Sequence, residues 1–330
     1  MSRKWFIFLV LCVIAAIVAY RAAGWEFDWS IFFSTIRNIH WGWLTMSVAV
    51  TVFTFVIRAI RWQELLKPIK KLGFGPVFTT TVMGFSAIFI LGRAGELVRP
   101  LWLARREKIS VSASFATIIV ERFIDSTMLI GIFAWALLTV KVSAGSTHEL
   151  ALMKDAAWYI VVVSAGAIAL LFILRFNVDL VVRYIPFQRV AKLVENFGHG
   201  LSFLQSGRSF AIVLFHSVVM WILIALQAWL TLKGMNFTLP FAATTLVMVG
   251  AAIGSVAQIP GIGGGFQLAF TFCLTQFFQV PKEAAISAAM IAYLASNLPT
   301  LATAIPCMLK DGLTIKEIRN TIRNPQSETI

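Results

Sequence analysis

The chain has 330 residues, of which 59% are hydrophobic and 13% charged, and its formal net charge is +13. Soluble domains carry about 25% charged residues, so the composition excludes an ordinary soluble protein and predicts an all-α polytopic membrane protein. The basic residues are spread over short segments between apolar stretches and form no basic domain. This distribution argues against nucleic acid as a partner and is typical of the loops of membrane proteins.

Six apolar segments are long enough to be full transmembrane helices. They lie at about 5–23, 40–60, 111–140, 157–175, 209–232 and 284–309. The first follows Arg3 and Lys4 and has two interpretations, a cleaved signal peptide or an uncleaved helix. Its apolar run from Trp5 to Tyr20 is slightly long for a signal peptide, which favours the uncleaved helix.

Two further apolar segments, about 76–103 and 241–280, are broken near the middle by glycines, charges or Pro260. Neither half of either segment reaches the roughly 20 residues of a typical span. We therefore expect two re-entrant helical hairpins, each entering and leaving by one face of the membrane. Two ordinary crossings per segment are the alternative.

With two such hairpins, the 28 lysines and arginines sort unequally between the two faces. Nineteen fall on the inner face, among them Arg58 and Arg61, and six fall on the outer face. The other three, Arg93, Arg99 and Arg122, are assigned to the membrane. Because positive loops stay inside, the split predicts that both termini are cytoplasmic, and Trp62 is expected at the inner boundary.

Residues 1–310 are expected to form a single transmembrane domain, followed by a short polar cytoplasmic tail at 311–330. Between spans four and five, apolar residues recur at spacings of three and four from Phe187 to Leu204. This pattern predicts an amphipathic helix at about 187–204 on the inner interface, with a plain connector as the alternative.

The two broken segments also resemble each other. "TTTVMGFSA" begins at Thr79 and "TTLVMVGAA" at Thr244, an offset of 165 residues. Because the first segment enters from inside and the second from outside, the pair fits an inverted repeat with interrupted helices, the arrangement that many transporters use for a midplane site. Chance similarity between apolar segments is the alternative.

Residues 90–103, "ILGRAGELVRPLWL", place charges inside the first broken segment. Gly92 and Gly95 are expected at the hairpin tip, where a new half-helix begins and its free N–H groups attract anions. Arg93 and Arg99 add forked donors that suit a phosphate. Glu96 is spaced to pair with either arginine.

The next span carries a second set of charges in "IIVERFID", where Glu121, Arg122 and Asp125 lie deep within apolar sequence. Together with Arg93, Glu96 and Arg99 they sum to zero. One interpretation is a buried ion network that locks the first hairpin to this span, since intramembrane charges pair by default. The other is a polar cradle for a substrate.

The second hairpin contains the turn "IPGIGGG", in which Pro260, Gly261, Gly263 and Gly264 let the backbone approach a ligand closely. Gln267 offers a neutral hydrogen-bonding group beside this turn, and Asn297 offers another in the last span. Neither the turn nor its neighbours form a nucleotide loop or a metal-ligand cluster, so no cofactor and no metal are predicted.

The segments "GRAGELVRP", "SVSASFATIIVERFID" and "IPGIGGG" resemble the lysylphosphatidylglycerol synthase/flippase transmembrane-domain family, which includes the membrane half of the multiple peptide resistance factor. The resemblance implies a multi-pass protein of the cell (inner or cytoplasmic) membrane that moves lipids between leaflets. It also implies a role for the matching residues, which are Gly92, Gly95, Glu96, Arg99, Glu121, Arg122, Asp125, Pro260 and Gly261. Gln267 stands where the family commonly has glutamate, which favours an anionic or neutral substrate over a cationic one.

These observations predict a flippase or transporter for a polar-headed, anionic or phosphate-bearing lipid, with a phospholipid or polyprenyl phosphate as the partner molecule. No catalytic motif is visible, so an enzyme is not expected. Two alternatives remain: a membrane glycosyl or headgroup transferase that uses a lipid-linked donor, and a non-catalytic partner of a lipid-synthesis enzyme.

Overall fold

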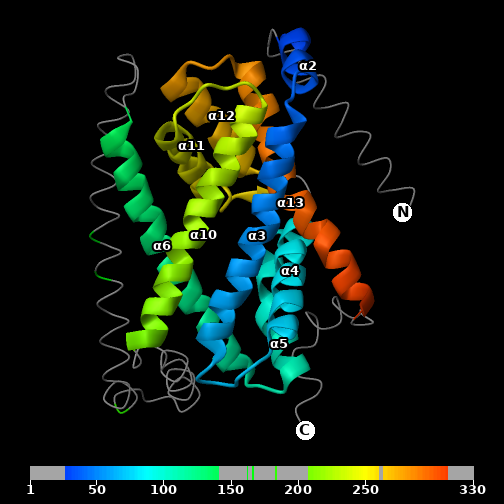
Figure 1. Ribbon diagram of the computed structural model, residues 1–330, viewed down its shortest axis with the longest axis vertical. Coiled ribbons are helices and arrows are strands. Elements are labelled where there is room, and N and C mark those ends of the chain that lie inside the picture. Colours follow the sequence, from blue (N-terminus) through cyan, green and yellow to red (C-terminus); the bar gives the residue numbers. More distant parts are fainter. Residues whose placement is uncertain are drawn as a thin grey trace.

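The computed structural model describes residues 27–140, 207–259 and 263–310, together with the single positions 162, 166 and 183. The span predicted at 5–23, the helix predicted at 187–204 and the tail 311–330 lie outside the described residues, as does the span predicted at 157–175 except for positions 162 and 166. Within them the chain is mainly helical (Figure 1). Its elements are α2 (Trp29–Arg37), α3 (Trp41–Leu66), α4 (Phe74–Leu91), the 3-10 helix η1 (Gly92–Leu97), α5 (Val98–Glu107), α6 (Val111–Thr139), α10 (Gly207–Gly234), α11 (Phe241–Gly254), β1 (Gln258–Ile259), β2 (Gly263–Gly264), α12 (Gly265–Phe278) and α13 (Lys282–Lys310).

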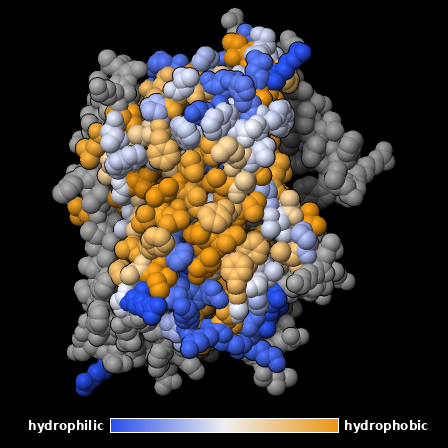
Figure 2. All heavy atoms as spheres, in the orientation of Figure 1, coloured by the Kyte–Doolittle hydropathy of each residue, from blue (hydrophilic) through white to orange (hydrophobic). Residues whose placement is uncertain are grey.

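Four described helices combine the length and the hydropathy that a membrane crossing needs: Trp41–Leu66, Phe74–Leu91, Gly207–Gly234 and Lys282–Met308. Three of them match predicted spans, and the second is the first arm of a predicted hairpin. The face in Figure 2 carries a broad hydrophobic band between two hydrophilic ends, as a bilayer requires. The predicted span at 111–140 forms the 29-residue helix α6, which carries charged residues in its middle.

Both broken segments fold into helical hairpins. α4 packs against η1 and α5, and α11 packs against α12. In Figure 1 the first hairpin lies in the lower half of the bundle and the second in the upper half, so they reach inward from opposite ends. Their tips meet, because β1 contacts η1. β1 and β2 form a short antiparallel pair at the tip of the second hairpin.

Glycines allow the close approach of the arms in each hairpin. Gly92 turns the chain at a φ of 64°, a conformation that side chains disfavour. A Cβ on Gly95 would lie 2.3 Å from the backbone of Ala87. In the second hairpin a Cβ on Gly254 would lie 2.3 Å from the carbonyl oxygen of Gly265. The two arms of each hairpin therefore touch through their backbones at these glycines, where a larger residue would not fit.

The order helix, hairpin, helix occurs twice in the described chain. The paired elements begin at Trp41 and Gly207, at Phe74 and Phe241, at Val98 and Gly265, and at Val111 and Lys282. α3 and α10 pack along each other in opposite directions, since His40 at the start of α3 donates its N–H to Gly234 at the end of α10 over 2.7 Å. The two sets of elements are thus arranged in opposite senses, as an inverted repeat requires.

Candidate functional site

A buried ion cluster joins α3, α5 and α6 around the carboxylate of Glu121, which is 0% exposed. Its Oε1 atom lies 2.8 Å from Nη1 of Arg99, 3.1 Å from Nη2 of Arg122 and 3.2 Å from Nη2 of Arg61. Its Oε2 atom accepts no hydrogen bond from the described residues. Three of the predicted site residues, Arg99, Glu121 and Arg122, therefore do come together, on two helices of the bundle.

Asp125, one helical turn after Glu121, binds Arg61 through both oxygens. Nη1 of Arg61 donates to Oδ1 at 2.5 Å and Nη2 donates to Oδ2 at 3.2 Å. Nη1 also donates to the hydroxyl of Ser217 on α10 at 3.0 Å. The assignment of Arg61 to an inner loop was wrong: the residue is 1% exposed, and α3 continues beyond the predicted span, carrying Arg61 into the bundle.

Arg99 is held by aromatic rings as well as by Glu121. Its guanidinium carbon lies 3.8 Å from the ring centroid of Trp62 and 5.6 Å from that of Phe85. The indole N–H of Trp62 donates to the hydroxyl of Thr117 at 3.0 Å. The side chain of Trp62 is fully buried and serves as a platform for Arg99, so its ring does not face lipid as an interfacial anchor would.

A further arginine, Arg58, lies on α3 one turn before Arg61. Its guanidinium carbon is 4.7 Å from the ring centroid of Phe85 and 6.0 Å from that of Phe55. Arg58 is under the electrostatic influence of Arg61, Arg122, Glu121 and Asp125. We call these five residues together with Arg99 the arginine cluster. These six residues comprise four arginines and two carboxylates, a different set from the six charges summed in the sequence, and their formal charge is +2.

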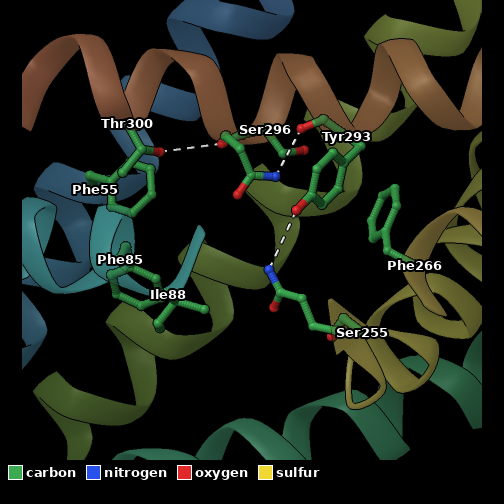
Figure 3. A pocket seen from close by; sticks show the side chains of 10 residues that line it. Phe55, Phe85, Ile88, Ser255, Phe266, Tyr293, Ser296 and Thr300 are labelled. Atoms are coloured by element: carbon green, nitrogen blue, oxygen red, sulfur yellow. Dashed lines mark hydrogen bonds between the residues drawn. The ribbon is translucent and has the colours of Figure 1, made fainter. Parts of the chain in front are cut away.

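A cavity of about 130 Å³ lies between α4 of the first hairpin, the second hairpin, and the helices α3 and α13 (Figure 3). Its lining is aromatic and neutral polar, and among the described residues that form it none is acidic or basic. The lining residues are Phe55, Phe85, Ile88, Ser255, Gln258, Phe266, Tyr293, Ser296, Asn297 and Thr300. Gln258 in β1 donates to the hydroxyl of Tyr293 at 3.4 Å and so ties the second hairpin to α13.

Of the residues predicted from the second hairpin and the last span, Asn297 lines this cavity and donates to the carbonyl of Tyr293 at 2.8 Å. Gly263 and Gly264 form β2, each with positive φ. The carboxamide of Gln267 packs directly against Gly263. Pro260 and Gly261 lie outside the described residues.

In the first hairpin, Gly92 and Gly95 lie in η1, the turn that the sequence predicted. Glu96 is in the same turn with a half-buried side chain, and the side chain of Arg93 lies outside the described part. The sequence analysis did not identify Arg58, Tyr293, Ser296 or the aromatic lining. Their positions follow from packing among four elements, and only the charge of Arg58 in a long apolar helix was visible beforehand.

The cluster and the cavity share a wall. Phe55 and Phe85 line the cavity, contact each other at a centroid distance of 5.3 Å, and carry Arg58 on their rings. A chamber with aromatic and neutral polar walls therefore lies beside the half-buried positive charge of Arg58. This combination suits a ligand that has a neutral hydrogen-bonding part and an anionic part.

Replacing Arg61 with lysine is expected to destabilise the protein by about 1.5–3 kcal/mol, because an ammonium cannot reproduce the forked contact with Asp125 and the bond to Ser217. Thermal unfolding in detergent measures the effect. Arg37→Lys, on the exposed last turn of α2, is the matched control and is expected to leave the unfolding temperature unchanged. Equal shifts in both variants would contradict the bidentate arrangement.

Comparison with known proteins agrees with the sequence motifs. Residues 7–303 match the family described as the lysylphosphatidylglycerol synthase TM region. The chain is 24% identical over 313 residues to the glycosyltransferase AglD of Haloferax volcanii, covering 82% of this chain and 49% of that protein. It is 21% identical over 281 residues to the UPF0104 membrane protein MJ1595 of Methanocaldococcus jannaschii, covering 78% of this chain and 82% of that protein. The chain thus spans about half of AglD and most of MJ1595, and it belongs to the lysylphosphatidylglycerol synthase transmembrane-region family.

Proposed function

We propose that this membrane protein is a flippase or transporter that moves a lipid with an anionic or phosphate-bearing headgroup between the leaflets of the cell membrane. The observation that carries the proposal is the cavity between the two hairpins, α3 and α13, with the arginine cluster behind its aromatic wall. A headgroup would occupy this polar region while the acyl or prenyl tails stay in the bilayer. The small volume suits a headgroup rather than a whole lipid.

The arrangement of the helices suggests how access to the cavity alternates. In the proposal both hairpins are re-entrant, with both termini cytoplasmic, and the two opposed sets of elements act as an inverted repeat. In the proposal each hairpin moves as one stiff unit, because its arms touch at glycines. Rocking of one stiff hairpin against the other would open the cavity first to one side and then to the other.

Leaflet exchange tests this function. The protein is reconstituted into liposomes that contain a trace of fluorescent phosphatidylglycerol, and a membrane-impermeant reductant then quenches the probe in the outer leaflet. With the protein, we expect quenching to proceed to probe that starts in the inner leaflet; empty liposomes keep that probe protected. No exchange above empty liposomes, for phosphatidylglycerol or for a fluorescent polyprenyl phosphate, would contradict the proposal.

Two neighbouring residues on α13 provide a matched pair of variants. Asn297→Phe places a ring in the cavity and is expected to reduce the exchange rate at least tenfold. Leu298→Phe adds a ring of similar size at a position that is 49% exposed and is expected to leave the rate unchanged. Equal rates in the two variants would mean that lipids do not pass through this cavity.

The name of AglD favours a second candidate, a membrane glycosyl or headgroup transferase or a non-catalytic partner of one. The similarity covers 49% of AglD, so the name of that protein does not assign transfer to the matched half. Incubation of the purified protein with a lipid-linked sugar donor and a lipid acceptor tests this candidate. A new glycolipid that forms without other proteins would establish the transferase.

A further inference from the structure

Arg58 has no acidic partner among the described residues, although it lies in a membrane-length helix. No carboxylate of the described chain approaches its guanidinium within ion-pair distance, and the group instead lies against the rings of Phe55 and Phe85. By contrast, Arg61, Arg99 and Arg122 each bind Glu121 directly. Among the described residues, the guanidinium of Arg58 thus contacts aromatic rings and no carboxylate, whereas the carboxylates of Glu121 and Asp125 nearby already pair with other arginines.

An arginine in a membrane helix is costly unless an opposite charge or water compensates it. The two carboxylates of the arginine cluster already face three other arginines, which leaves the cluster with two positive charges in excess. Aromatic rings attract the cation, but they carry no net charge and cannot balance it. An anion bound at Arg58 would provide the missing balance.

The rings that carry Arg58 fix where such an anion would lie. Phe55 and Phe85 also line the cavity, so the two rings that contact the guanidinium form part of the chamber wall, although Arg58 itself is not among the lining residues. The lining also includes the hydroxyl of Tyr293, which lies across the chamber from Phe85 in Figure 3, and the carboxamides of Asn297 and Gln258. Such neutral groups bind other hydroxyl groups well and provide no carboxylate for a cationic headgroup.

We infer that Arg58 is the phosphate-binding residue of the transport site and that the neutral chamber takes a hydroxyl-bearing headgroup attached to this phosphate. The inference rests on the proposed function and narrows its substrate class to lipids in which a phosphate links the tails to an uncharged polyol, such as glycerol or a sugar. A guanidinium matches two phosphate oxygens with its forked donors. Lipids with a cationic headgroup are disfavoured at this site.

Binding of short-chain lipids to the full-length protein in detergent tests the inference by calorimetry. We compare dihexanoyl phosphatidylglycerol, dihexanoyl phosphatidic acid, which lacks the polyol, dihexanoylglycerol, which lacks the phosphate, and dihexanoyl phosphatidylcholine, which has a cationic headgroup. The wild type is expected to bind phosphatidylglycerol most tightly. Arg58→Gln is expected to weaken binding of phosphatidylglycerol and phosphatidic acid by about tenfold to hundredfold and to leave dihexanoylglycerol unchanged.

Two further variants separate the contribution of the Arg58 charge to lipid binding from the contribution of the neutral residues that line the chamber. Lys71→Gln removes the same charge from an exposed loop and is expected to bind every lipid as the wild type does. Asn297→Leu is expected to weaken phosphatidylglycerol binding several-fold while leaving phosphatidic acid unchanged. If Arg58→Gln does not fold, Phe85→Leu removes the nearer of the two rings that contact Arg58 at constant net charge and is expected to weaken the binding of both phospholipids.

Several results would overturn the inference. Unchanged phospholipid binding in Arg58→Gln, or in Phe85→Leu where the first variant does not fold, would exclude Arg58 as the phosphate site. Tighter binding of phosphatidylcholine than of phosphatidylglycerol would exclude the polyol class. Inorganic phosphate that binds as tightly as phosphatidylglycerol would show that the ligand is a free anion. If the wild type binds phosphatidylglycerol through Arg58 but shows no leaflet exchange, the result contradicts the proposed transport and not the inference. If the wild type and Arg58→Gln exchange lipid at the same rate, the result contradicts the inference and not the proposed transport.

Discussion

Replacing Glu121 with glutamine is expected to destabilise the protein by about 3–5 kcal/mol, because removing one partner of a buried ion pair leaves uncompensated charge behind. The glutamine keeps the size of the side chain and removes only the negative charge. Its position receives three guanidinium groups, and the carboxylate is fully buried. Thermal unfolding in detergent and the yield of monodisperse protein measure the effect.

An exposed ion pair provides the control for Glu121. Lys70→Gln breaks the 3.3 Å contact with Glu107, in which the lysine side chain is 46% exposed, and is expected to cost less than about 1 kcal/mol. Combining Glu121→Gln with Arg99→Gln removes one stranded cation together with the carboxylate. The double variant is expected to be less destabilised than the sum of the two single variants. Additive effects would contradict a direct interaction between these residues.

The charges on α5 and α6 could be predicted to meet because intramembrane charges seek partners. Arg99, Glu121, Arg122 and Asp125 accordingly lie in one cluster. The contribution of α3 could not be predicted in the same way. Arg61 follows an apolar run, where basic residues usually mark a loop, and only the fold shows that the helix continues to Leu66.

The hairpins were predictable because their interruptions are local features of the sequence. Gly92 and the glycines after Pro260 break long apolar runs, and helices of 14 residues on both sides of the second break are too short to cross a bilayer. The cavity was not predictable from local features. It is lined by residues of α3, both hairpins and α13, and their proximity depends on long-range packing.

Replacing Gly254 with alanine is expected to disrupt the second hairpin, because α11 and α12 touch through their backbones at this position. The new methyl group would lie 2.3 Å from the carbonyl oxygen of Gly265 and 2.5 Å from Cβ of Ala269. Neither atom belongs to a flexible side chain that could turn away. Overpacking of this kind costs about 1–3 kcal/mol and sometimes more, which outweighs the gain in helix propensity of about 0.5–1 kcal/mol.

The matched control for this variant is Gly131→Ala in α6, where a Cβ would meet no atom within 4 Å. That variant is expected to raise the unfolding temperature slightly, since alanine favours the helix, whereas Gly254→Ala is expected to lower it. If the proposed function is correct, only Gly254→Ala also slows leaflet exchange, because parting α11 from α12 displaces Gln258 and with it the tie to Tyr293 beside the cavity. Shifts of the same sign and size in the two variants would mean that the hairpin tolerates separation of its arms, and rocking of stiff hairpins would then lose its structural basis.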